Sequence, residues 1–127
     1  MVEIRTYTSE YENELMNLIK QEGEDWKIYW EEPSNESRYR KSFELSITYI
    51  AFIDGKVCGY SRSIKETLFI YVCDLLVNKE YRGYGIGKKL MQCVIDEYPD
   101  YPVYVMSGND EYYQKLGAKR EGSIFLL

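Results

Sequence analysis

The sequence predicts one domain of the α/β (α+β) class, in which helices flank a mixed, mostly antiparallel sheet. The chain has 127 residues, a usual length for a domain with a single core. Strand-like runs rich in aromatic and β-branched residues alternate with segments of helical periodicity. Asp54 and Gly55 lie between two such runs and form the strongest short signal for an antiparallel hairpin. We therefore expect one domain over residues 1–127 with the element order β-α-α-β-β-β-α-β-α-β.

The first third of the chain is expected to form a strand and two helices. Residues 2–7 are strand-like, and Ser9 with Glu12 has the spacing of a capping box, which would begin a helix. Four residues at helical spacing give this helix one core-facing side: Tyr11, Leu15, Leu18 and Ile19. The pattern fades near Gly23, and a second helix is expected from residue 35 or 36 to residue 44.

The remaining elements follow from changes of period. Strands are expected at residues 46–53, 56–65 and 67–77, and an amphipathic helix at 86–98. A short strand at 102–106 and a short helix at 109–116, ended by Gly117, come next. Residues 118–127 are predicted to form a last strand or hairpin.

Composition excludes several classes of function. The formal net charge of −5 argues against a nucleic-acid partner, whose binding surface would be basic. No apolar run approaches the roughly 20 residues of a membrane-spanning helix, and the start of the chain is acidic, unlike a signal peptide. We therefore expect a cytoplasmic protein that binds no membrane.

Cysteine and histidine usage limits the chemistry. Cys58, Cys73 and Cys93 are odd in number and widely spaced, which favours small apolar side chains over disulfides or a zinc site. The chain has no histidine, so the usual general base and the usual metal ligand are both absent. No metal site is expected.

The segment VNKEYRGYGIGKKL, residues 77–90, has three glycines at alternate positions between a predicted strand and a predicted helix. Glycine beside a helix costs about 1 kcal/mol relative to alanine, so three together indicate a group that approaches the backbone closely. The spacing fits neither the nucleotide P-loop nor the dinucleotide fingerprint G-x-G-x-x-G. It fits R-x-x-G-x-G, as Arg82, Gly85 and Gly87.

This arrangement suits a pyrophosphate. Backbone N–H groups can close on the phosphates, the helix N-terminus adds partial positive charge, and Arg82, Lys88 and Lys89 supply full charges. The alternative is a tight strand-to-helix turn with no ligand.

The same segment closely resembles the central motif of the GNAT superfamily of N-acetyltransferases, in which R/Q-x-x-G-x-G/A binds the pyrophosphate of acetyl-coenzyme A (acetyl-CoA). Residues 112–118, YYQKLGA, resemble the later F-Y-x-K-x-G-F motif of that superfamily. The order of elements is also similar, so the resemblance covers nearly the whole chain. It implies that acetyl-CoA is the cosubstrate.

Roles carry over to particular positions. The resemblance implies contacts to the pyrophosphate from Arg82, Gly83, Tyr84, Gly85, Ile86, Gly87 and Lys88. The backbone of Leu75, Leu76 and Val77 would lie along the pantetheine arm, in the strand that splays from its neighbour in this family. Tyr113 stands at the position of the family's tyrosine near the thioester sulfur. The stretch between Asn109 and Tyr113 is shorter than in the family, which leaves the role of Asn109 open.

Direct acetyl transfer to an amine needs a general acid and a general base. Tyr113, with an ordinary pKa of about 10, is the candidate acid, and packing is its alternative role. Asp74 is the candidate base; alternatively its carboxylate caps or pairs with a neighbouring strand. Other candidates for the base are Glu31, Glu32 and Asp25.

The resemblance implies that the segment between the first two helices shapes the acceptor pocket. Trp26, Tyr29 and Trp30 could form an aromatic wall there for a cation or a ring, or else these aromatics belong to the core. Glu31 is a further candidate for the lining of this pocket.

The leading hypothesis is an enzyme that moves the acetyl group of acetyl-CoA to a primary amine, most simply a small-molecule amine or a polyamine. One alternative is a CoA-binding sensor or interaction module without turnover. Another is an acetyltransferase for lysine side chains or N-termini of proteins and peptides. Small members of the family are often dimers, which makes a homodimer one option for this chain.

Overall fold

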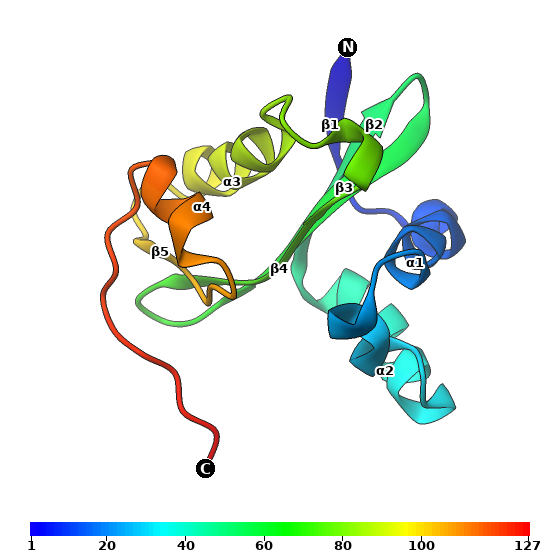
Figure 1. Ribbon diagram of the computed structural model, residues 1–127, viewed down its shortest axis with the longest axis horizontal. Helices are drawn as coiled ribbons and strands as arrows, with labels where there is room; N and C mark the ends of the chain where they lie inside the picture. The colour runs from blue at the N-terminus through cyan, green and yellow to red at the C-terminus, as the bar shows by residue number, and fades with distance from the viewer.

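The computed structural model describes residues 1–127 and has helices on both faces of a five-stranded sheet (Figure 1). The strands are β1 Val2–Thr6, β2 Ile47–Ile53, β3 Lys56–Lys65, β4 Ile70–Val77 and β5 Val103–Val105. Their order in the sheet is that of the sequence. The pairs from β1 to β4 are antiparallel, and β4 with β5 is parallel. The predicted mixed, mostly antiparallel sheet is confirmed.

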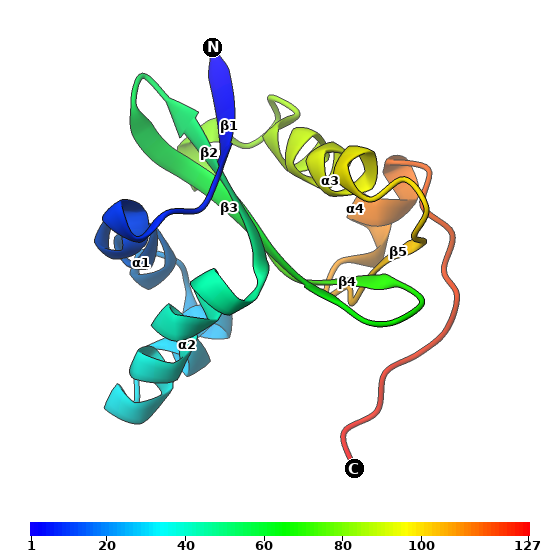
Figure 2. The same ribbon diagram turned by 180° about the vertical axis from the view of Figure 1, so that it is seen from behind.

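The helices divide between the two faces of the sheet, as the front and back views show (Figures 1 and 2). One side carries α1 Glu12–Lys20 and α2 Pro33–Leu45, and the other carries α3 Ile86–Glu97 and α4 Asp110–Lys115. Short 3-10 turns precede α1, α2 and α3: η1 Ser9–Tyr11, η2 Glu24–Tyr29 and η3 Lys79–Tyr81. None of these helices is both long enough and apolar enough to cross a membrane.

Local sequence explains most of these boundaries. Asp54 and Gly55 adopt φ values of 51° and 76°, as a two-residue hairpin turn with two left-handed positions requires. Helix α2 begins at Pro33, two or three residues before the predicted start, because proline has a helical φ and no N–H that a first turn would leave unpaired.

Two predictions about local structure are wrong. The capping box does not form, because Ser9 lies within η1 and its backbone carbonyl, not its hydroxyl, accepts the N–H of Glu12. The last predicted strand is also absent: residues 118–127 have no strand partner, and the apolar side chains from Ile124 to Leu127 are exposed (Figure 1). A suitable run of side chains makes a strand only when a neighbouring strand offers its backbone groups.

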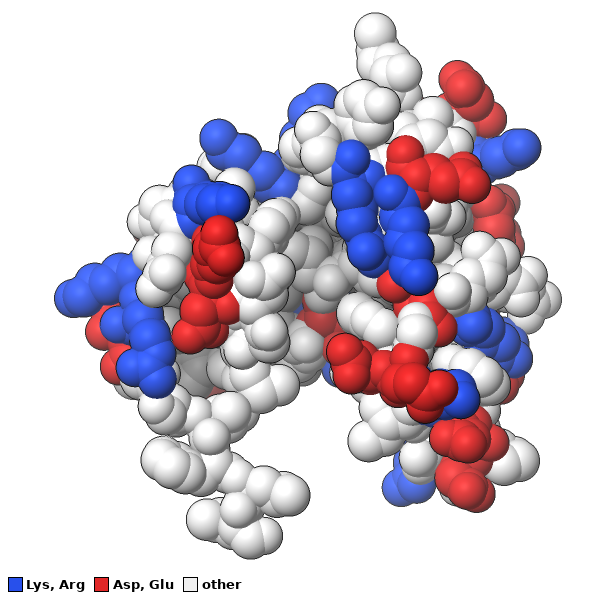
Figure 3. Space-filling model, viewed as in Figure 1, with Lys and Arg blue, Asp and Glu red and all other residues white.

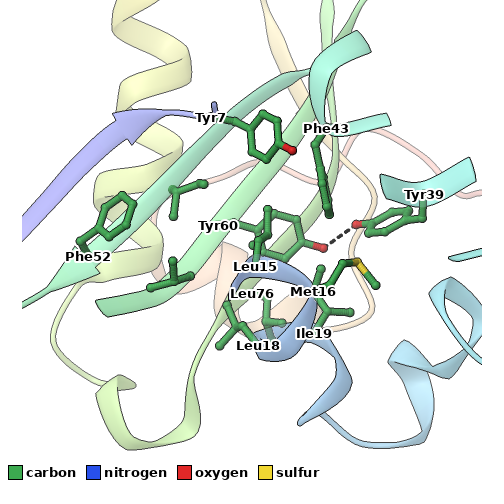
Figure 4. Packing of buried hydrophobic residues seen from close by; sticks show 12 residues of the cluster. Tyr7, Leu15, Met16, Leu18, Ile19, Tyr39, Phe43, Phe52, Tyr60 and Leu76 are labelled. Carbon is green, nitrogen blue, oxygen red and sulfur yellow. Dashed lines mark hydrogen bonds between the residues drawn. The ribbon is translucent and has the colours of Figure 1, made fainter. Parts of the chain in front are cut away.

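Two hydrophobic clusters hold the helices to the sheet. The larger one lies under α1 and α2 and includes Leu15, Phe43, Tyr60 and Leu76 (Figure 4). The smaller one lies under α3 and contains Ala51, Cys58, Ile86 and Leu90. All three cysteines are free, and Cys58 is a buried apolar side chain as predicted. The sheet is thus fixed on both faces, which holds β4 in the middle of the molecule.

Gly59 in β3 is required by the close approach of β4. A Cβ atom at this position would lie 2.8 Å from the carbonyl oxygen of Leu76, a backbone atom that cannot rotate away. We expect Gly59→Ala to lower the free energy of unfolding by about 1–3 kcal/mol, measured by urea denaturation. Gly23→Ala is the matched control, because nothing lies within 4 Å of its added methyl group. Equal stability of the two variants would contradict this packing argument.

Candidate functional site

Strands β4 and β5 separate soon after they meet. Their parallel register ends at Val72 and Val105, while β4 continues to Val77 with a neighbour only on the β3 side. The N–H of Asn78 donates to the carbonyl of Cys58 at 2.8 Å, which shows which alternate residues of β4 form hydrogen bonds with β3. Figure 3 shows the resulting hollow between the two halves of the molecule.

This hydrogen-bond pattern also decides which backbone groups of β4 face the space between β4 and β5. In an antiparallel pair, alternate residues turn their N–H and C=O groups toward the partner strand. Leu76 therefore bonds to β3, whereas Leu75 and Val77 turn their backbone groups toward the space that β5 has left. Of the three residues predicted to line the pantetheine arm, two offer free N–H groups, while Leu76 contributes its side chain to the core.

The glycine segment forms the turn between β4 and α3. Gly83 and Gly85 have φ values of 87° and 77°, the left-handed region that favours glycine. The backbone N–H groups of residues 83–88 donate no hydrogen bond within the chain. Lys88 and Lys89 are exposed and have no carboxylate partner. A row of free N–H groups at a helix N-terminus, with two lysines nearby, is suited to a phosphate.

The third glycine has a reason within the fold. A Cβ atom on Gly87 would overlap the hydroxyl of Tyr112 and would lie 3.7 Å from Cδ2 of Leu75. Gly87 therefore allows α3, α4 and β4 to meet closely at the point where β4 and β5 separate. Sequence reasoning assigned this glycine to the phosphate alone and missed its contact with Tyr112.

The Arg82 side chain turns back toward the sheet. Its Nε donates to the carbonyl of Val77 at 2.9 Å, and its Nη2 pairs with Glu22 at 3.0 Å. These bonds fix the turn against the end of β4 and against the segment after α1. Next to it, Tyr84 is 72% exposed and Ile86 is buried. Arg82 thus shapes the turn, and its guanidinium is already engaged.

Asp74 lies on the face of β4 that α1 and α2 cover, opposite the face that contacts α3, and its side chain is 2% exposed. Oδ1 accepts a hydrogen bond from the hydroxyl of Tyr29 at 2.5 Å. Oδ2 accepts one from Tyr39 at 2.8 Å and one from Nε of Arg62 at 2.7 Å. The alternative prediction, a carboxylate paired with a neighbouring strand, is what the structure has, since Arg62 belongs to β3.

The tyrosines form a directed chain of hydrogen bonds. Because the hydroxyl of Tyr39 gives its proton to Asp74, the 2.5 Å contact between Tyr39 and Tyr60 has Tyr60 as donor (Figure 4). Burial, reinforced by Asp74, raises the pKa of Tyr29 and of Tyr39, and burial raises that of Tyr60. Burial opposes the charge of Arg62, but Asp74 outweighs it and raises the pKa of the guanidinium. All these groups therefore remain donors at neutral pH.

An open pocket of about 350 Å³ lies beside this network. Ile28 and Tyr29 of η2 line it, with Asn35, Arg38, Tyr39 and Ser42 of α2 and Arg62 of β3. Three members of the hydrogen-bond network around Asp74 therefore reach the pocket: Tyr29, Tyr39 and Arg62.

The other predicted pocket residues lie elsewhere. Trp26 and Trp30 are half-buried and pack against the core, as the alternative prediction had it. Glu31, Glu32 and Asp25 are exposed and do not line the pocket. No acidic side chain lines this pocket, although Glu31 was expected to lie beside a bound cation or ring there.

Helix α4 supplies Tyr113. Its side chain is half-buried, and its ring packs edge-on against Tyr112 at 5.0 Å between centroids. The hydroxyl makes no hydrogen bond within the chain, and burial, with a smaller effect from Tyr112, raises the pKa of Tyr113 to about 12. The Asn109 side chain caps α4 by accepting the N–H of Tyr112 at 3.2 Å, which answers the question of its role within the fold.

Residues 12–118 match the family described as acetyltransferase (GNAT) family. The chain belongs to this family. The resemblance of the glycine segment and of residues 112–118 is thereby confirmed, and the protein is a GNAT N-acetyltransferase that uses acetyl-CoA.

Solved structures share the GNAT fold with this chain. Ribosomal-protein-alanine N-acetyltransferase from Brucella melitensis biovar Abortus 2308 matches with a TM-score of 0.80 and 15% identity, over 100% of this chain and 98% of that chain. An aminoglycoside acetyltransferase from an uncultured soil metagenomic sample matches with a TM-score of 0.77 and 21% identity, over 100% of this chain and 97% of that chain. PaiA N-acetyltransferase from Thermoplasma acidophilum, solved in complex with coenzyme A, matches with a TM-score of 0.70 and 22% identity, over 98% of this chain and 93% of that chain.

Several residues of the candidate site were not predicted from sequence: Tyr39, Tyr60, Arg62, Tyr112 and Arg38. Only Tyr112 carried a signal, because it lies inside the recognised motif. Arg62 opposes Asp74 across a ladder whose register shifts between Arg62 and Ser63, and such a shift cannot be read from alternation.

Removing the Asp74 carboxylate should destabilise the fold. In Asp74→Asn the buried Arg62 charge loses its partner, so we expect the free energy of unfolding to fall by about 3 kcal/mol. Tyr29→Phe removes one donor and should cost about 1 kcal/mol. Asp100→Asn, at an exposed position, is the control. Urea unfolding measures all three, and an Asp74→Asn variant as stable as the control would contradict the network's role.

Proposed function

We propose that this GNAT enzyme transfers the acetyl group of acetyl-CoA to a primary amine of a small molecule by direct attack on the thioester. The observation that carries the proposal is the line of free backbone N–H groups from Leu75 and Val77 to residues 83–88. It gives a donor surface for a pantetheine arm at one end and for a pyrophosphate at the other. The pocket beside Asp74 then receives the amine on the opposite face of β4.

In the reaction, the amine nitrogen attacks the thioester carbonyl carbon, the C–S bond breaks, and the CoA sulfur leaves as a thiolate. The carbonyl oxygen becomes negatively charged on the way, and the free N–H of Leu75 is a donor for it. Backbone groups held by a sheet need little reorganisation as this charge develops.

Tyr113 is proposed as the acid that protonates the departing thiolate. Its hydroxyl is not engaged within the chain, and with a pKa of about 12 it carries its proton at neutral pH. The usual pKa of a thiol, about 8.5, is lower than this, so the transfer leaves a strongly basic tyrosinate. That tyrosinate takes up the proton that the acylated nitrogen must release, which restores Tyr113.

Asp74 is proposed as the final proton acceptor, and Tyr29 as its link to the pocket. Both oxygens of Asp74 are covered by donors, so an amine cannot reach them directly. The ammonium proton can pass to the oxygen of Tyr29 while the hydroxyl proton of Tyr29 passes to Oδ1 of Asp74, 2.5 Å away. The net result is a neutral amine and a protonated Asp74.

A thiol-release assay with acetyl-CoA and a panel of small amines, polyamines, amino acids and peptides tests the proposed function. We expect release with at least one small amine, and a turnover at least about tenfold lower in Tyr113→Phe with CoA affinity nearly unchanged. Tyr104→Phe, which removes an exposed hydroxyl on β5, is the control. Unchanged turnover in Tyr113→Phe would remove Tyr113 from the mechanism.

The same panel separates the competing functions. Binding of CoA without release for any acceptor would favour a sensor, and release with peptides alone would favour a protein acetyltransferase. Failure to bind CoA would overturn the proposal.

A further inference from the structure

The pocket beside Asp74 is positively charged, although the chain has a formal net charge of −5. Its charged lining residues are Arg38 and Arg62, and no carboxylate lines it. Asp74 neutralises Arg62 from beneath, so Arg38 adds one positive charge that has no counterpart. A pocket for a simple amine or a polyamine would be expected to have the opposite sign.

Both guanidinium groups keep unused donors. Arg38 donates from Nε to the carbonyl of Ser34 at 3.3 Å and from Nη2 to Oδ1 of Asn35 at 2.8 Å, which leaves Nη1 without a partner. Arg62 donates from Nε to Asp74 and from Nη1 to Ser46 at 3.2 Å, which leaves Nη2. These side chains are therefore held in place and still have free N–H groups.

Acidic residues near the pocket are directed elsewhere or stand outside it. Glu36, on the same helix as Arg38, pairs with Lys20 and Arg40, both at 2.9 Å. Asn35 also donates from Nδ2 to the carbonyl of Ile28 at 3.1 Å, so one side chain joins η2 to α2 and orients Arg38 as well. The positive charge of Arg38 is thus fixed and is not neutralised from within the chain.

We propose that the acetyl acceptor is a primary amine that also carries an acidic group, carboxylate or phosphate, bound by Arg38 and by Nη2 of Arg62. This inference rests on the proposed function and names the substrate class of the same site. Guanidinium N–H groups match the oxygens of both acids. With the acid at Arg38, the amine end faces Tyr29, from which its proton can pass to Asp74.

Matched pairs of amines test this assignment: ethanolamine with phosphoethanolamine, tyramine with tyrosine, and glucosamine with glucosamine 6-phosphate. The first and third pairs probe phosphate, and the second probes carboxylate. We expect kcat/KM for the acidic member to exceed that of its neutral partner by about 10- to 100-fold in at least one pair.

Arg38→Gln should remove most of this preference. It should raise KM for the acidic amine about 10- to 100-fold, a much larger effect than on kcat/KM for the neutral partner. Lys41→Gln on the same helix is the matched control, because Lys41 is exposed, has no carboxylate partner and does not line the pocket. It loses the same charge and should behave as wild type.

Calorimetry in the presence of CoA measures binding of the same pairs without turnover. Tighter binding of the acidic members that is lost in Arg38→Gln supports the inference even if no amine is acetylated, which would overturn only the proposed function. Equal use and equal binding of both members of every pair would overturn the inference. So would an Arg38→Gln variant that affects acidic and neutral amines alike.

Discussion

The site depends on one geometric constraint, the early separation of β4 from β5. Beyond Val72 the strand has a neighbour on one side only, so the backbone groups of Leu75 and Val77 have no partner within the sheet. A bare strand edge inside a molecule is costly unless something satisfies it. In a GNAT enzyme the cosubstrate can do so, and the free N–H groups at the start of α3 continue the same surface.

The two faces of β4 make different contacts. On the α3 side, Gly87 packs against the side chains of Leu75 and Tyr112, so the turn, α4 and the strand are fixed relative to one another. On the α1 and α2 side, Asp74 joins η2, α2 and β3 through Tyr29, Tyr39 and Arg62. A buried ion pair adds little stability compared with apolar packing, but it fixes the positions of its partners. Those partners form a wall of the pocket that we propose receives the acceptor.

Sequence could predict the features that depend on local pattern. Periodicity gave the strands, the helices and the Asp54 turn, and the spacing of Gly83, Gly85 and Gly87 indicated the phosphate turn. It could not give side-chain partners set by register, because the shift beside Arg62 moves it opposite Asp74. Contacts between distant elements were also out of reach, so Gly87 was assigned to a ligand and its contact with Tyr112 was missed. A last strand was expected from residues 118–127, although a strand forms only where a neighbouring strand is there to pair with it.

Amide hydrogen exchange, resolved by residue with NMR, tests the central claim most directly. Without ligand, the N–H groups of Leu75, Val77 and residues 83–88 should exchange quickly, whereas that of Leu76, bonded to β3, should be protected. Saturation with CoA should slow exchange at Leu75, Val77 and 83–88 at least about tenfold and leave Leu76 unchanged. Saturated binding with no added protection at these positions would contradict the account.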